Sequence, residues 1–251
     1  MMSLSTAPRP WIIAHRGASL EAPENTLAAF SLALQLGARM IELDVRQCRA
    51  GEVVVIHDET VGRTTDGEGA VADLTLPELR ALDAGSWKDP AFRGERIPTL
   101  EEALLQIGDR AAVAIDIKGR SSALPGAVVR LLQHTGRLDD AIVLARQLEV
   151  VREVQQLDPR VWTSCYSHSS PALWREQRAA LERWPSDFLF VRPEELDLSD
   201  MAEAQRAGLH VVTTLEHRRS VSGSEVRALA HAGVDGILGD DVRLLVEALG
   251  R

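Results

Sequence analysis

Residues 40–57, MIELDVRQCRAGEVVVIH, decide the fold because they hold two apolar, strand-like runs separated by a very short turn. The first run is Met40 to Val45 and the second is Glu52 to Ile56. A parallel crossover needs about a dozen residues or more, so the second run is predicted to return antiparallel, as a hairpin. The hairpin is expected to bring His57 roughly opposite Glu42, one of two acids in the first run.

Outward from this hairpin, short apolar runs alternate with segments of helical periodicity, which is the pattern of repeated βα units on a parallel sheet. Eight runs are predicted as its strands: Trp11 to Ala14, Met40 to Val45, Ala112 to Ile117, Ala141 to Ala145, Val161 to Tyr166, Phe188 to Val191, Leu209 to Thr214 and Val234 to Leu238. The predicted helices are Asn25 to Leu36, Leu124 to His134, Leu148 to Leu157, Pro171 to Trp184, Asp200 to Ala207 and Ser224 to Ala232. Eight strands with crossover helices favour an α/β fold of the closed (β/α)8 TIM-barrel type over an open sheet.

The chain of 251 residues is close to the length of about 250 that one such barrel commonly uses, so a single domain over residues 1–251 is expected. The longest break in the βα rhythm runs from Asp58 to Arg110 and includes the turn-rich sequence TTDGEG and a short predicted helix at Leu76 to Leu82. Long loops inside compact domains are usually functional. We therefore expect this insertion to form a small cap over the barrel mouth.

Composition narrows the classes of partner. Lys and Arg total 28 against 37 Asp and Glu, which gives a formal net charge of -9 and makes nucleic acid an unexpected partner. The sequence contains no apolar stretch of signal-peptide or membrane-spanning length, so a cytoplasmic protein without stable membrane anchoring is expected. Cys48 and Cys165 lack a CxxC spacing and are predicted to be free thiols. The oligomeric state cannot be predicted from these features.

Polar residues end the first three predicted barrel strands, at the edge where barrel enzymes gather their reactive groups. Because strand side chains alternate, Glu42 and Asp44 point the same way, and so do Asp116 and Lys118. Three converging carboxylates would repel one another without a cation between them, and an all-oxygen ligand set favours Mg²⁺ or Ca²⁺ over zinc. Glu42, Asp44 and Asp116 are therefore the candidate ligands of a divalent metal.

Two histidines and two cations accompany these acids. His15 ends the first strand and His57 ends the hairpin, and imidazoles there suit general acid and general base catalysis. Arg16 and Lys118 add positive charge, as expected if the ligand carries a phosphate. The composition of the site therefore favours a small-molecule ligand that carries a phosphate.

The chain resembles the glycerophosphodiester phosphodiesterase family in HRGAS, APENTLAAF, the stretch IELDVRQCRAGEVVVIHDETVGRTTDGEG, ADLTLPELRALDAGSW, IPTLEEAL, IDIKG and GVDGILGD. The resemblance runs from about Trp11 to Asp241 and implies hydrolysis of a glycerophosphodiester to an alcohol and glycerol 3-phosphate. It assigns His15 and His57 as the acid/base pair, Glu42, Asp44 and Asp116 as metal ligands, Arg16 and Lys118 as phosphate contacts, and Asn25 and Asp58 as supporting motif residues.

Some positions depart from the family pattern. Asp116 stands where the family usually has Glu, so its side chain is one methylene shorter. Ala145-Arg146 replaces a usual Ser-Phe pair at the end of one predicted strand. Arg192 directly follows another predicted strand, Phe188 to Val191. We interpret Arg146 and Arg192 as signs of a more polar or more anionic substrate, against the simpler reading of surface ion pairs.

Two other functions fit parts of the pattern. The related phospholipase D-type toxins share the HR, E-x-D and second-histidine features and can carry Asp at the third ligand position, but the long insertion argues against that group. A catalytically silent barrel that binds a phosphorylated ligand is the alternative outside enzymes, and the intact histidine pair argues against it.

Overall fold

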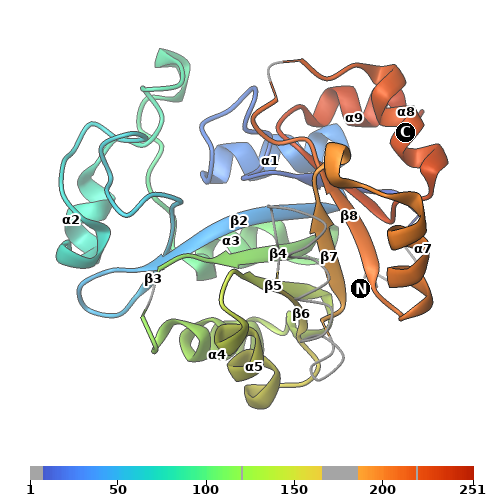
Figure 1. The fold of residues 1–251 in the computed structure, drawn as a ribbon. Coiled ribbons are helices and arrows are strands. Elements are labelled where there is room, and N and C mark those ends of the chain that lie inside the picture. The colour runs from blue at the N-terminus through green and yellow to red at the C-terminus, as the bar shows by residue number, and fades with distance from the viewer. Residues whose placement is uncertain (1–7, 120, 166–185, 219) are drawn as a thin grey trace.

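The protein folds into a closed barrel of parallel strands in the computed structural model, which describes residues 8–119, 121–165, 186–218 and 220–251 (Figure 1). In the described residues the strands follow the order β6-β5-β4-β2-β1-β9-β8-β7, and every neighbouring pair in this order is parallel. Their bounds are β1 (Trp11–Ala14), β2 (Met40–Gln47), β4 (Ala112–Ile117), β5 (Ala141–Ala145), β6 (Trp162–Cys165), β7 (Phe188–Val191), β8 (His210–Thr214) and β9 (Gly236–Gly239).

The barrel closes between β6 and β7 through side chains as well as backbone. The Asp187 amide donates to the Thr163 carbonyl at 2.9 Å, and the Thr163 amide donates back to the Asp187 carboxylate at 2.9 Å. The Ser164 hydroxyl also donates to the Phe188 carbonyl at 2.7 Å. These bonds join the two ends of the strand order, so the predicted closed barrel is confirmed.

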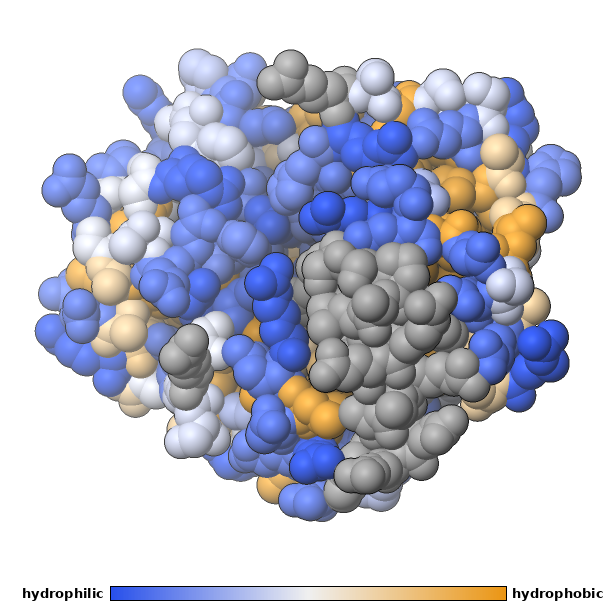
Figure 2. Space-filling model, in the orientation of Figure 1, coloured by the Kyte–Doolittle hydropathy of each residue, from blue (hydrophilic) through white to orange (hydrophobic). Residues whose placement is uncertain are grey.

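Helices surround the strands (Figure 1). Their buried apolar residues lie in the same core cluster as strand residues such as Ile12 and Ile41. Hydrophilic residues accordingly predominate in the described part of the surface in Figure 2. The predicted helix Pro171 to Trp184 lies outside the described residues, as does Tyr166 of the predicted fifth strand. Two short helices, α3 (Leu100–Ile107) and α9 (Val242–Ala248), are not among those predicted from the sequence. The outer helices are α1 (Leu27–Leu36), α3 (Leu100–Ile107), α4 (Leu124–Thr135), α5 (Leu148–Leu157), α7 (Leu198–Arg206), α8 (Gly223–Ala232) and α9 (Val242–Ala248).

The predicted hairpin is confirmed: β3 (Val53–Val55) pairs antiparallel with β2, with Val55 opposite Val45. Continued by two residues, this register puts position 57 opposite Leu43 and not Glu42. The expected pairing was therefore one residue off. The Cys48 amide donates to the Glu52 carbonyl at 3.0 Å, which fixes the turn at a point that the apolar pattern alone does not define.

The insertion that follows has its own small core. Leu79 of α2 (Leu76–Ala81) packs in a buried apolar cluster with Val61 and Val71, and α2 stands apart from the barrel helices in Figure 1. The insertion predicted from the sequence extends to Arg110. In the structure the insertion ends earlier, because α3 packs its apolar side into the main core as the crossover helix before β4. We therefore call residues 58–99 the cap. Short 3-10 helices are η1 (Val71–Asp73), η2 (Pro90–Phe92), η3 (Gly108–Arg110), η4 (Leu138–Asp140) and η5 (Pro193–Glu195).

Both cysteines are buried and free, as predicted. In the part of the chain that the structure describes, no helix has the length and apolar character needed to cross a bilayer. The compartment stays a prediction.

Candidate active site

The barrel interior determines which polar side chains meet. Trp11 and Ile13 of β1, Met40 of β2 and Ala114 of β4 belong to the buried apolar cluster inside the barrel. Because successive strand residues face opposite sides, the residue two positions beyond each inward residue also faces the lumen. The lumen therefore opens into a cavity of about 220 Å³ whose lining includes His15, Arg16, Glu42, Asp44, His57, Asp116, Lys118, Arg146, Arg192, Glu216 and His217.

Three acids form the centre of this cavity. Glu42 and Asp44 come from β2 and Asp116 from β4, and the register pairs Asp44 directly with Asp116. Each acid is buried, and one carboxylate oxygen from each lies within 4.8 Å of the others. The shorter side chain of Asp116 therefore still reaches the cluster.

Basic groups hold two of these acids in place. Arg16 Nε lies 3.0 Å from Asp44 Oδ2, and Lys118 Nζ lies 3.2 Å from Asp44 Oδ1 and also contacts Asp116. Asn25 Nδ2 donates to Asp44 Oδ2 at 2.8 Å, and the Asp44 amide donates to Asn25 Oδ1 at 3.2 Å. Burial would raise the pKa of Asp44, but Arg16 and Lys118 hold it below its ordinary value.

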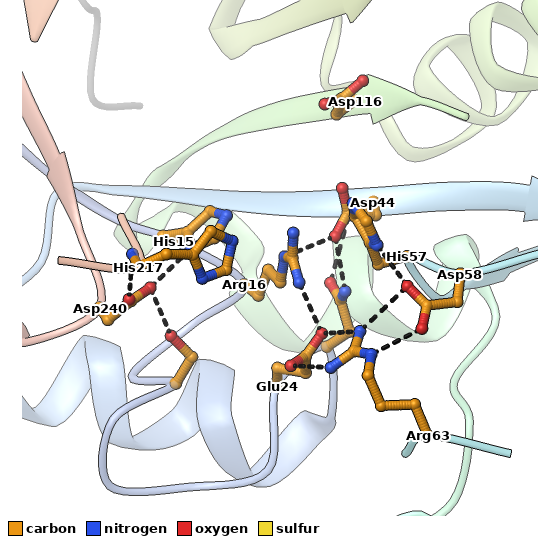
Figure 3. Close-up of polar contacts among 12 residues, drawn as sticks. His15, Arg16, Glu24, Asp44, His57, Asp58, Arg63, Asp116, His217 and Asp240 are labelled. Atoms are coloured by element: carbon orange, nitrogen blue, oxygen red, sulfur yellow. Dashed lines mark hydrogen bonds and ion pairs between the residues drawn. The ribbon is translucent and has the colours of Figure 1, made fainter. Parts of the chain in front are cut away.

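His15 is oriented by a carboxylate from the far end of the chain. Its Nδ1 lies 2.6 Å from Asp240 Oδ1 (Figure 3). Its Nε2 lies 4.0 Å from Glu42 Oε2. Asp240 also accepts hydrogen bonds from the Ser19 hydroxyl and the His217 amide. Burial would lower the pKa of His15, but the hydrogen bond to Asp240 and the charge of Glu42 raise it to about 9.

His57 has a similar arrangement on the other side of the acid cluster (Figure 3). Its Nδ1 lies 2.6 Å from Asp58 Oδ1, and Asp58 in turn receives the Arg63 guanidinium at 2.6 Å. Arg63 also binds both Glu24 oxygens, at 2.8 and 2.9 Å, while Glu24 accepts from Arg16 at 2.8 Å. A continuous series of charged contacts therefore runs from His57 through Arg63 of the cap to Arg16, which contacts the candidate metal ligand Asp44.

The acid cluster fits a divalent cation. Three carboxylates face two contacting cations, Arg16 and Lys118, which leaves one negative charge when all are ionised. Burial and the charge of Asp44 raise the pKa of Glu42 to about 8, so the cluster resists full ionisation without a further positive charge. Buried oxygen donors at this spacing match the preference of Mg²⁺ or Ca²⁺.

The structure brings together every site residue that the sequence singled out, with Arg146 lining the same cavity and Asn25 and Asp58 each contacting one of its residues. Sequence reasoning missed Glu24, Arg63 and Asp240 as members of the site. Asp240 directly follows β9, and this position at a strand end was the signal that could have identified it.

The chain is similar to proteins of one family over nearly all of its length. The model of the "Glycerophosphoryl diester phosphodiesterase family" matches residues 15–244. The glycerophosphodiester phosphodiesterase of Caldanaerobacter subterraneus subsp. tengcongensis is 36% identical over 242 residues, covering 94% of this chain and 96% of the relative.

Solved structures agree with this similarity. An Oleispira antarctica phosphodiesterase, solved in complex with the product sn-glycerol-3-phosphate, has a TM-score of 0.84 at 29% identity, covering 96% of this chain and 97% of that one. A glycerophosphodiester phosphodiesterase from Agrobacterium tumefaciens has a TM-score of 0.81 at 33% identity, covering 94% and 99%. The resemblance seen in the sequence motifs is thus confirmed, and the chain belongs to the glycerophosphoryl diester phosphodiesterase family.

Proposed function

We propose that this protein hydrolyses a glycerophosphodiester to an alcohol and glycerol 3-phosphate, with His15 and His57 as the acid/base pair beside a divalent metal. One observation carries the proposal. Two imidazoles, each with its Nδ1 held by an Asp carboxylate, line the same cavity as a buried cluster of three acids. Family membership and the product bound to the Oleispira antarctica relative support the same substrate class.

The carboxylates on Nδ1 determine which nitrogen of each ring does the chemistry. Asp240 engages Nδ1 of His15 and Asp58 engages Nδ1 of His57, which leaves Nε2 of both rings for the substrate. One Nε2 accepts the proton of the attacking oxygen, either water or a hydroxyl next to the phosphate, as the new P–O bond forms. Attack by the hydroxyl gives a cyclic phosphate, which a water molecule must then open to yield glycerol 3-phosphate. The other donates a proton to the leaving alcohol oxygen as the old P–O bond breaks.

Glu42, Asp44 and Asp116 would hold the metal, Mg²⁺ or Ca²⁺. When bound, the cation would neutralise charge on the non-bridging phosphate oxygens. Arg16 and Lys118 keep Asp44 ionised, and both line the cavity where the phosphate would lie. We assign them a phosphate-binding role alongside this electrostatic one.

The test measures glycerol 3-phosphate release from simple glycerophosphodiesters, with chelator and after readdition of Mg²⁺ or Ca²⁺. His15→Ala and His57→Ala should each abolish turnover while circular dichroism and metal affinity stay close to wild type. His134→Ala, on the exposed end of α4, is the matched control and should retain full activity. A silent ligand-binding barrel would release nothing from any diester. A phospholipase D-type enzyme would release the headgroup alcohol from a lysophospholipid but not from the deacylated glycerophosphodiester. Either result would overturn the proposal.

A further inference from the structure

Two arginines extend into the substrate cavity on the side away from β1 and β2. Arg146 directly follows β5 and Arg192 directly follows β7, and the strand between them in the barrel is β6. Each lies two residues beyond an inward apolar side chain, Leu144 or Phe190, of the buried cluster inside the barrel. Strand alternation therefore directs both guanidinium groups toward the lumen, and both line the same cavity as the catalytic candidates.

These two arginines differ from the other arginines of the site. Arg16 and Arg63 are each bound by two carboxylates. Within the described ranges, neither Arg146 nor Arg192 has a side-chain hydrogen bond or ion pair, and both are exposed. Glu216 lines the same cavity, but in those ranges it forms no ion pair with either of them. In the part of the fold that the structure describes, no acidic side chain therefore pairs with their positive charges.

The phosphodiester itself does not require this charge. With the three acids ionised, one negative charge remains on the cluster after Arg16 and Lys118 are counted, and a bound divalent cation would change it to one positive charge. A phosphodiester carries one negative charge and balances that site alone. Two further guanidinium groups in the same cavity suit a second anion, since planar guanidinium donors recognise carboxylate and phosphate oxygens.

We propose that Arg146 and Arg192 form an anion subsite, so that the preferred substrate is a glycerophosphodiester whose alcohol carries a carboxylate or phosphomonoester. The inference rests on the proposed function and adds the class of leaving group. In this arrangement the alcohol extends from the reacting phosphorus toward the C-terminal ends of β5 and β7. Its anion then lies between the two guanidinium groups.

Pairs of substrates that differ by one anionic group provide the test. Glycerophosphoserine differs from glycerophosphoethanolamine by a carboxylate, and glycerophosphoinositol 4-phosphate differs from glycerophosphoinositol by a phosphomonoester. We expect wild-type kcat/KM to favour the anionic member of at least one pair by roughly tenfold or more. The pair that shows the preference identifies the anion.

Variants then assign the preference to the two arginines. The Arg146→Gln/Arg192→Gln double variant should bring the ratio close to one while kcat/KM for the less anionic substrate changes little. The Arg206→Gln/Arg227→Gln double variant, which removes the same number of charges from exposed positions on α7 and α8, should keep the wild-type ratio. Equal wild-type rates within both pairs, or a preference that survives in the double variant, would overturn the subsite and leave the hydrolase intact. Absence of turnover with all four diesters would instead overturn the proposed function.

Discussion

Asp240→Asn tests the histidine chemistry most directly. The wild-type carboxylate lies 2.6 Å from His15 Nδ1 and has a side chain that is 26% exposed. The amide oxygen of Asn can still accept a hydrogen bond from an Nδ1–H, so the ring orientation should survive. The negative charge that stabilises the imidazolium is lost.

The structure gives the size of this loss. Burial would raise the pKa of Asp240, but the hydrogen bond and charge of His15 lower it from 3.8 to about 2. A shift of this size corresponds to about 2 kcal/mol, at about 1.4 kcal/mol per pKa unit. The pKa of His15 moves further, to about 9, because Glu42 also raises it. If the pair acts in the transition state, Asp240→Asn should lower kcat/KM by roughly 30-fold.

The assay is the pH dependence of kcat/KM for diester hydrolysis. Without the Asp240 charge the pKa of His15 falls, so the limb of the profile that reports His15 should move to lower pH, whether the ring acts as acid or base. Ser19→Ala removes a 3.2 Å hydrogen bond to Asp240 but leaves its charge, and should change kcat/KM only a few-fold. An Asp240→Asn profile that superimposes on wild type would refute the reasoning.

The same pair should contribute to stability in a defined pH window. The folded pKa of Asp240 is depressed, so its contribution is full above 3.8 and is lost as pH falls through about 2. The folded pKa of His15 is raised, so its contribution is full below 6.5 and is lost as pH rises through about 9. Calorimetry of metal-free protein should therefore show the largest Tm difference between wild type and Asp240→Asn from about pH 4 to 6.5. A difference that does not vary with pH would contradict this account.

Three further changes test other parts of the site. Arg63→Gln should lower kcat/KM by up to about tenfold, because Arg63 orients the Asp58 carboxylate that contacts His57. The free energy of unfolding should change little, because half-exposed ion pairs are weak, and a stability loss without a kinetic effect would contradict the orienting role. Asp116→Asn should reduce metal-dependent turnover by at least about 100-fold and Asp116→Glu should retain most of it, as isothermal titration with Mg²⁺ and assays would show. Gly17→Ala should cost about 1–3 kcal/mol in urea unfolding, because Gly17 has φ 82° and a Cβ there would lie 2.7 Å from the Ala29 backbone; an unchanged midpoint would exclude this strain.

Strand-level features of this fold could be predicted from the sequence because they depend on local periodicity. Apolar runs set the barrel strands, and alternation along them placed Glu42 and Asp44 on one face without any tertiary information. Helix α3 was assigned to the cap because it follows an irregular segment. Its capping box, Thr99 with Glu102, was the local signal for a new helix, and its buried Leu100 and Leu104 join it to the barrel core.

Contacts between segments that are distant in the sequence were harder to predict. Glu24 and Arg63 are 39 positions apart, and their pairing depends on how the cap folds back over the loop after β1. Charged residues in polar loops are common, so neither residue carries a local pattern that marks it as part of a site. Their joint role follows only from the geometry.

The two His–Asp pairs illustrate this difference within one site. Asp58 could be chosen from the sequence because it directly follows His57, whereas Asp240 lies 225 positions from His15. Barrel closure removes that separation, since β1 pairs with β9 in a register that sets Ala14 beside Gly239. The next positions along both strands are then 15 and 240. A closed barrel with a correct register for its first and last strands is therefore sufficient to predict the second carboxylate, and strand order carries information about catalysis that the motifs alone do not.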